Sequence, residues 1–177
     1  MKSVLFSALF LLVCAQVNAQ KVQIADNCDS EKGWNANLTV DRVDFKEGTG
    51  SLKVESVSPF LFRKAFTTPV NTGLDGKSGY IGLWLYISDV TDVQANPGML
   101  QIASSGKAEL NAHHWSLKSL NLQKGWNKVV FELNASSAKG GDFDGSNLNY
   151  FMLMQKTAQP ITFKIDNIRF AKNLNDL

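Results

Sequence analysis

Short runs of alternating apolar and polar residues make up most of this chain, and no segment keeps the 3.6-residue period of an amphipathic helix. In the run 51–57, Leu52 and Val54 fall on one face of an extended segment. Lys53 and Glu55 fall on the other face. The pattern therefore predicts a β protein with little helix. The expected strands lie at 22–25, 38–43, 51–57, 60–66, 80–87, 99–103, 115–122, 126–133, 149–155 and 161–171.

The segments between these runs are rich in Gly, Asn, Asp and Ser, and sharp turn signals occur at 47–50 and 139–142. Many short strands at even spacing, joined by such turns, are typical of an antiparallel sandwich. We therefore predict an all-β fold, an antiparallel β-sandwich (jelly roll) of about ten short strands. The run 80–87 is apolar on both faces, which favours a central strand. Its expected core-facing set is Ile81, Leu83, Leu85 and Ile87.

Residues 1–19 have the features of a secretory signal peptide. Lys2 gives a positive start, residues 5–13 are apolar apart from one serine, and 17–19 resemble a signal-peptidase site. The apolar run is shorter than the roughly 18 to 20 residues that a spanning helix needs, and no second run follows. We therefore expect export to a secreted, periplasmic or cell-surface location, no membrane span, and a single domain over 20–177.

The chain has two cysteines, Cys14 and Cys28, and the first lies inside the expected leader. An exported domain with one thiol has no internal disulfide, so its stability rests on its core or on a bound ion. The alternative for Cys14 is lipoprotein acylation. Val13 stands where such signals prefer Gly, Ala or Ser, so cleavage of the leader is the interpretation we keep.

The charge balance argues against a nucleic-acid partner. The sequence carries 18 Lys plus Arg and 16 Asp plus Glu, a formal net charge of +2, and these residues are scattered rather than gathered in a basic stripe. A hydrophobic content of 44% is enough for a core at this length. The composition is thus that of an ordinary globular domain.

Four short segments carry a resemblance to a known family. They are 24–34 (IADNCDSEKGW), 46–54 (KEGTGSLKV), 125–127 (GWN) and 165–170 (IDNIRF). In their order and spacing they resemble the jelly-roll carbohydrate-binding modules and related galactose-binding-like domains of secreted bacterial proteins, over about residues 22–171. The resemblance implies a fold and a polysaccharide or oligosaccharide partner. It does not imply catalysis, because fold and function separate readily in such sandwiches.

Many modules of that kind hold one structural calcium ion through an acid on the first strand, carbonyl groups of the glycine turn and an Asp on the last strand. The resemblance places these ligands at Asp26 or Asp29, the turn 46–51, and Asp166. Oxygen ligands suit a hard cation. The sequence departs from the family where its usual Phe-Glu pair reads Cys28-Asp29. The alternative is that these acids cap turns and close a strand through backbone hydrogen bonds.

Other candidate sites are weaker. The acidic segment 142–147 lacks the Gly and Glu that a helical calcium loop needs at its sixth and twelfth positions. His113 and His114 are adjacent, so on a strand they point to opposite faces and cannot share one metal ion. No Gly-x-Ser-x-Gly elbow occurs, and the run 101–103 lacks the His of alginate-lyase-type enzymes. We therefore assign no catalytic residue.

Sugar binding requires aromatic faces for the apolar side of a pyranose and polar groups for its hydroxyls. Trp34 and Trp126 each follow a Gly and are expected to anchor the core. The residues expected to contact a glycan are Arg63, Trp84, Tyr86, Gln101, His114 and Trp115.

The sequence thus predicts a secreted, non-catalytic carbohydrate-binding domain. One alternative is a polysaccharide-active glycoside hydrolase or lyase on the same jelly-roll fold, for which Glu55, Glu109 and Glu132 would be the carboxylates to test. A second alternative is a structural or adhesive surface domain.

Overall fold

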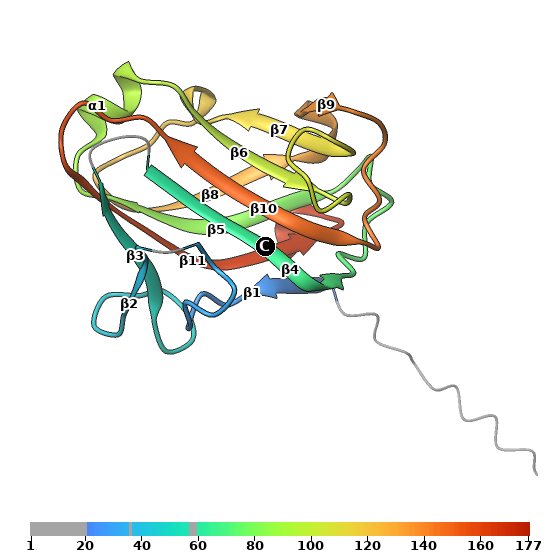
Figure 1. The fold of residues 1–177 in the computed structure, drawn as a ribbon, viewed down its shortest axis with the longest axis horizontal. Coiled ribbons are helices and arrows are strands. Elements are labelled where there is room, and N and C mark those ends of the chain that lie inside the picture. Colours follow the sequence, from blue (N-terminus) through green and yellow to red (C-terminus); the bar gives the residue numbers. More distant parts are fainter. Residues whose placement is uncertain (1–20, 36, 57–59) are drawn as a thin grey trace, which may run out of the picture.

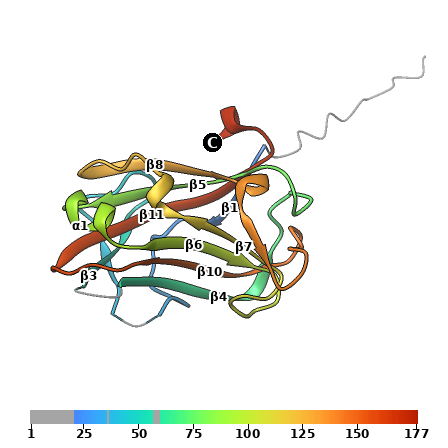
Figure 2. The same ribbon diagram turned by 90° about the horizontal axis from the view of Figure 1, so that it is seen from above.

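The computed structural model describes residues 21–35, 37–56 and 60–177. The predicted leader and Cys14 lie outside them. The described chain forms two antiparallel sheets, which confirms the predicted all-β sandwich. Figure 1 shows the strands of one sheet in front of those of the other, and Figure 2 shows the two layers from above.

Six strands form the first sheet, called sheet A here. They are β1 (Val22–Asp26), β2 (Thr39–Asp41), β3 (Ser51–Ser56), β5 (Tyr80–Ile87), β8 (Gly125–Glu132) and β11 (Ile161–Ala171). Their order is β2-β3-β11-β5-β8, and β1 pairs with the last part of β11. The predicted central strand β5 therefore lies inside the sheet, between β11 and β8.

Five strands form the second sheet, called sheet B. They are β4 (Phe60–Val70), β6 (Gly98–Ala103), β7 (Ala112–Ser116), β9 (Ser137–Lys139) and β10 (Leu148–Gln155). Their order is β4-β10-β6-β7-β9, so β4 and β9 are its edges.

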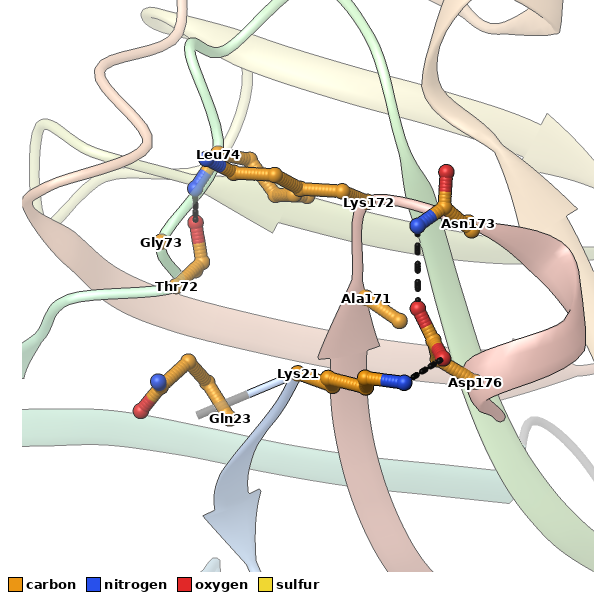
Figure 3. A pocket seen from close by; sticks show the side chains of 9 residues that line it. All are labelled: Lys21, Gln23, Thr72, Gly73, Leu74, Ala171, Lys172, Asn173 and Asp176. Atoms are coloured by element: carbon orange, nitrogen blue, oxygen red, sulfur yellow. Dashed lines mark hydrogen bonds and ion pairs between the residues drawn. The ribbon is translucent and has the colours of Figure 1, made fainter. Parts of the chain in front are cut away.

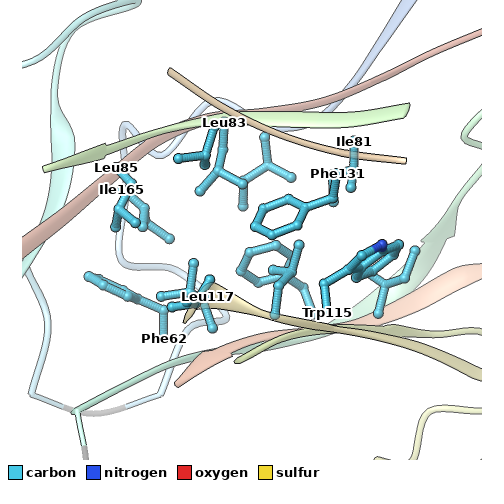
Figure 4. Packing of buried hydrophobic residues seen from close by; sticks show 14 of the residues in the cluster. Phe62, Ile81, Leu83, Leu85, Trp115, Leu117, Phe131 and Ile165 are labelled. Atoms are coloured by element: carbon cyan, nitrogen blue, oxygen red, sulfur yellow. The ribbon is translucent and has the colours of Figure 1, made fainter. Parts of the chain in front are cut away.

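The core lies between the sheets and is built by alternate residues of each strand. Ile81, Leu83, Leu85 and Ile87 are at most 1% exposed, which confirms the core-facing set expected for β5. Figure 4 shows residues of β5 facing Phe62 and Trp115 of sheet B across this core. Because side chains alternate along a strand, the outward set of each strand is fixed at the same time.

Some elements differ from the prediction because short polar side chains interrupt the strands. Helix α1 (Val90–Ala95) was not expected. It begins where the carboxylate of Asp89 accepts a hydrogen bond from the Thr91 N–H. The strand expected at 115–122 ends at Ser116, whose hydroxyl accepts from the Lys118 N–H and starts a 3-10 turn (Leu117–Ser119). Strand β9 and the 3-10 turns Leu133–Ala135 and Leu174–Asp176 complete the described elements.

No helix within the described ranges is long and apolar enough to cross a membrane.

Candidate functional site

Three of the six predicted glycan contacts meet in one row on the outer face of sheet B. Arg63 of β4 is paired with Met152 of β10, Met152 with Gln101 of β6, and Gln101 with His114 of β7. Four neighbouring strands thus present one residue each. The row continues to Ser137 of the edge strand β9.

The direction of this row follows from the apolar residues beside it. Phe62, Ile102 and Leu153 belong to the core between the sheets. Gln101 and Met152 are sequence neighbours of Ile102 and Leu153, so the alternation of a strand turns them to the opposite face. The two-residue alternation that turns one set of side chains into the core therefore turns this row to the outer face of sheet B.

Gln101 and His114 each carry a nitrogen that is buried and unsatisfied. In the part of the chain that the structure describes, Nε2 of Gln101 and Nε2 of His114 have no hydrogen-bond partner. Gln101 is only 1% exposed although it belongs to an outer face. A buried polar group without a partner costs about 1 to 3 kcal/mol. Because Gln101 and His114 are directly paired across β6 and β7, a single bound group could satisfy both atoms, which makes this pair a candidate position for a ligand.

His114 is held in its neutral form at neutral pH. Its pKa is lowered, first by burial and then by the positive charge of Lys139, with a smaller contribution from His113. The carboxylate of Glu109 opposes this shift, but Glu109 is itself bound to Lys139 at 2.8 Å. A neutral imidazole can donate or accept a hydrogen bond.

A pocket of about 420 Å³ opens beside this row on the same sheet. It is lined by Pro97, Gly98, Met99, His114, Trp115, Ser116, Ser137, Met154 and Lys156. Met99 of β6 is paired with Met154 of β10, one step along the strands from the pair of Gln101 and Met152. The pocket floor therefore has flexible thioether side chains, with His114 and serine hydroxyls beside them.

The prediction missed the residues of β10 that complete this face. Tyr150 packs with Ala103, Ala112 and Met152 in a small apolar cluster on the outer side of sheet B. Tyr150 is 8% exposed, and burial raises the pKa of its hydroxyl. The alternation of residues 148–155 would have placed Tyr150, Met152 and Met154 on one face, but their apolar character suggests a core rather than a site.

Trp115, another predicted contact, points into the core. It is 7% exposed, its indole N–H donates to the carbonyl oxygen of Glu132 at 2.8 Å, and its ring lies 5.7 Å from that of Phe131. Figure 4 shows it among the core side chains. Trp115 is among the residues that line the outer-face pocket, but its buried ring contributes to the core.

Trp84 and Tyr86 lie on the outer face of sheet A, on the opposite side of the molecule from Gln101. The Trp84 indole N–H donates to Oε1 of Glu47 at 3.0 Å, and the Lys46 ammonium lies 5.4 Å from its ring. The Tyr86 ring lies 5.5 Å from Trp126. The structure thus does not bring these two aromatic residues together with the sheet B row.

Many polar groups on the outer face of sheet A bind one another. Lys164 binds the carboxylates of Asp41 and Asp44 at 2.7 and 2.6 Å and lies over the ring of Tyr86. The bond from Lys164 lowers the pKa of Asp41 to about 2. The Trp126 indole N–H donates to Asp44 at 2.8 Å.

The expectation that Trp34 and Trp126 both anchor the core holds for one of them. Trp34 is buried against Phe62 and Phe151. For Trp126 the expectation is wrong. Val129 of β8 faces the core, and Trp126 lies three residues before it, so the two-residue period of the strand turns Trp126 outward.

Two of the predicted calcium ligands face the glycine turn, as the resemblance implied. Oδ2 of Asp166 accepts hydrogen bonds from the N–H groups of Lys46 and Glu47, at 2.7 and 2.9 Å. Oδ1 of Asp29 accepts from the Thr49 N–H at 2.6 Å. These contacts join the last strand and the first loop to the turn through N–H donors, which is the capping role left open above.

The third acid, Asp26, is paired with the ammonium of Lys64 and accepts from the Cys28 N–H. Oδ1 of Asp166 is buried without a hydrogen-bond partner among the described residues, and burial raises the pKa of this carboxyl. A carboxylate oxygen without a partner is chemically able to bind a cation. Within the described ranges, no group of three or more His, Cys, Asp or Glu is placed to hold a metal ion. Calcium binding stays a prediction.

A smaller hollow of about 220 Å³ lies where the two ends of the described chain meet (Figure 3). Several of its polar groups bond to one another. Asn173 donates to Asp176 at 3.0 Å, Lys21 lies 4.0 Å from Asp176, and the Leu74 N–H donates to Thr72 at 3.3 Å. We therefore place the candidate site on sheet B.

The carboxylates considered for hydrolysis lie on different elements. Glu55 belongs to β3 and is bound to Lys53, whereas Glu109 lies in the loop before β7 and is bound to Lys139. Glu132 ends β8. Glu55 thus belongs to sheet A and Glu109 to a loop of sheet B.

Comparison with solved structures shows the same fold in carbohydrate-binding modules. A family 11 module from Clostridium thermocellum, solved with a β-1,3-1,4-mixed-linked tetrasaccharide, matches with a TM-score of 0.58 at 11% identity, over 86% of this chain and 96% of that one. A family 30 module of a Clostridium thermocellum cellulosomal cellulase matches with a TM-score of 0.55 at 11% identity, over 88% and 93%.

An exo-β-agarase matches with a TM-score of 0.59 at 12% identity, over 85% of this chain but only 24% of the enzyme. No family model matches the sequence, and no curated protein does. The likeness at these identities establishes the jelly-roll fold that the sequence motifs indicated. The residues on the surface must therefore carry any argument about function.

Proposed function

We propose that this protein is a non-catalytic carbohydrate-recognition domain that binds a glycan on the outer face of sheet B. The observation that carries the proposal is the pair of unsatisfied nitrogens on Gln101 and His114, side by side on β6 and β7. A sugar hydroxyl or ring oxygen placed over them would supply the missing partners.

The surroundings of this pair support a sugar rather than a reacting substrate. Met99, Met152 and Met154 offer apolar surface beside the pair on β6 and β10, and Arg63 offers donors at one end of the row. The strands of sheet B carry neither Asp nor Glu in the segments β4, β6, β7, β9 and β10. Acid-base hydrolysis of a glycoside needs two carboxyl groups, so this face is suited to binding.

Export through the predicted leader would bring the domain to polysaccharides outside the cell. The test of this part is the N-terminal sequence of the protein recovered from its native host. We expect a mature chain that starts near residue 20. A retained or lipid-modified N-terminus would contradict the prediction that residues 1–19 are a cleaved signal peptide.

Binding itself is tested by titration calorimetry against soluble glycans, with the variants Gln101→Met and Trp84→Ala. The proposal expects saturable binding that Gln101→Met weakens about tenfold or more, the scale of one lost buried hydrogen bond. Trp84→Ala, on the other sheet, is the matched control and should bind like the wild type. Loss of binding in Trp84→Ala alone would move the site to sheet A, and a wide panel without any binding would refute the proposal.

A further inference from the structure

The polar groups on the outer face of sheet B are mainly hydrogen-bond donors and positive charges. Arg63 is exposed, and Lys156 is exposed at the rim of the pocket. Neither forms an ion pair with any residue that the structure describes. Nε2 of Gln101, a donor, and the neutral imidazole of His114 lie on the same face, on β6 and β7. The face therefore offers mainly donors and positive charge.

The two sheets differ sharply in acidic residues. The strands of sheet A contain Asp26, Asp41, Glu55, Glu132 and Asp166. The strands of sheet B contain none. The acid near the sheet B row is Glu109, which Lys139 already binds. An anion on this face would consequently meet uncompensated positive charge.

The apolar chemistry of the face points the same way. A neutral pyranose usually lies against an exposed aromatic ring. On the described outward positions of sheet B, the one phenol or indole ring is Tyr150, and it is nearly buried. Methionine side chains can cover the apolar side of a sugar but give no flat platform. Affinity on this face has to come largely from its donors.

We infer that the glycan bound here is acidic, and that Arg63 and Lys156 recognise its carboxylate or sulfate groups while Gln101 and His114 bind its neutral oxygens. This inference rests on the proposed function and specifies its ligand. Arginine binds carboxylate and sulfate-like groups through two parallel hydrogen bonds. Three strand spacings separate Arg63 from His114, about 14 Å, which is long enough for an oligosaccharide across the strands.

The experiment compares four polymers by affinity electrophoresis and calorimetry. They are polygalacturonate, the same polymer with its carboxylates reduced to alcohols, dextran sulfate, and a neutral mixed-linkage glucan. We expect binding to polygalacturonate or dextran sulfate, and the polymer that binds tells carboxylate from sulfate. Reduction of the carboxylates should weaken binding about tenfold or more if the uronate is the ligand.

The matched variants are Arg63→Gln on the face and Arg42→Gln on the loop after β2. Each variant removes one exposed positive charge, so the two have the same net charge. Arg63→Gln should weaken anionic binding about tenfold, and Arg42→Gln should leave it unchanged, because only Arg63 lies on the proposed binding face. Equal weakening in the two variants would show attraction by net charge alone and overturn the inference.

A second readout is the pKa of His114, measured by proton NMR with and without the polymer. Burial, Lys139 and His113 lower the pKa of His114, and Glu109 raises it. A bound anion should add to the effect of Glu109 and raise the pKa further. A neutral glucan that binds with no loss in Arg63→Gln would overturn the acidic ligand and leave the proposed function standing. Failure of all four polymers would count against both.

Discussion

Gln101 on β6 and His114 on β7 are directly paired across the two strands, and each has a buried Nε2 atom without a hydrogen-bond partner among the described residues. The pair lies on the face of sheet B that does not build the core. The two residues lie side by side on one outward face, where a single bound group could satisfy both atoms, so the pair is the feature that best supports a binding face.

This relationship predicts an unusual response of stability to substitution. Gln101→Met removes an unsatisfied buried amide and keeps the side-chain volume, so the free energy of unfolding should stay the same or rise by up to about 1 kcal/mol. Urea unfolding of the variant measures this directly.

The matched control is Gln155→Met, on β10. The Gln155 amide donates to the carbonyl oxygens of Asn96 and Lys156, at 3.2 and 2.8 Å, so its loss should cost about 1 to 3 kcal/mol. If Gln101→Met destabilises as much as Gln155→Met, the amide of Gln101 has a structural partner and the argument for a ligand is lost.

Trp115 should behave as a core residue. Trp115→Ala is expected to cost about 3 to 5 kcal/mol of stability, because it removes a buried ring from between Phe131 and His113. Any loss of glycan binding in this variant would then follow from loss of the fold. Thermal unfolding distinguishes the cases, and a Trp115→Ala protein as stable as the wild type would contradict the core placement.

Acid should weaken the ion pair between Lys164 and Asp41 on the outer face of sheet A and so lower the stability of the fold. The pKa of Asp41 is about 2 in the folded protein, below its ordinary value of 3.8, chiefly because Lys164 donates to the carboxylate. A lowered folded pKa stabilises the protein above the unfolded pKa, and that stabilisation is lost as the pH falls from about 4 to about 2.

The variant Asp41→Asn should therefore cost about 1 kcal/mol at pH 7, and the difference from the wild type should narrow toward pH 2. Asp142→Asn, which alters an exposed loop carboxylate, is the control and should behave like the wild type throughout. A constant difference across this pH range would mean that the Lys164 pair does not stabilise the fold.

Calcium is expected to raise the melting temperature, and EDTA to lower it. The buried Oδ1 of Asp166 has no partner among the described residues, and the nearby Asp29 and Glu47 disfavour the ionised form of this carboxyl. A divalent cation at Oδ1 would offset both effects. Asp166→Asn should abolish the calcium response. Identical melting curves with calcium and with EDTA would show that this fold has no stabilising calcium ion.

The sandwich could be predicted because its signals are local. The alternation along 80–87 fixed which residues of β5 enter the core, and the glycine and asparagine turns marked where strands end. The same local signals missed the end of β7 at Ser116, where one hydroxyl is enough to turn the chain.

The candidate site could be predicted only in part, because residue type does not tell which sheet a strand joins. Arg63, Gln101 and His114 share one row because β10 lies between β4 and β6 in the sheet, although it is far from both in the sequence. Trp84 and Tyr86 had the chemistry expected of a sugar platform, but they lie on the other sheet. Trp115 differs from His114 by one residue, and that one step of the strand period puts it in the core.

The central claim is that a glycan lies over Gln101 and His114. The most direct measurement is the ¹H–¹⁵N NMR spectrum of the protein during titration with the glycan that it binds. We expect the signals of the Gln101 side-chain amide and the His114 imidazole to shift, while the indole N–H signals of Trp84 and Trp126 stay in place. Shifts of the two indoles with an unchanged Gln101 amide would contradict it.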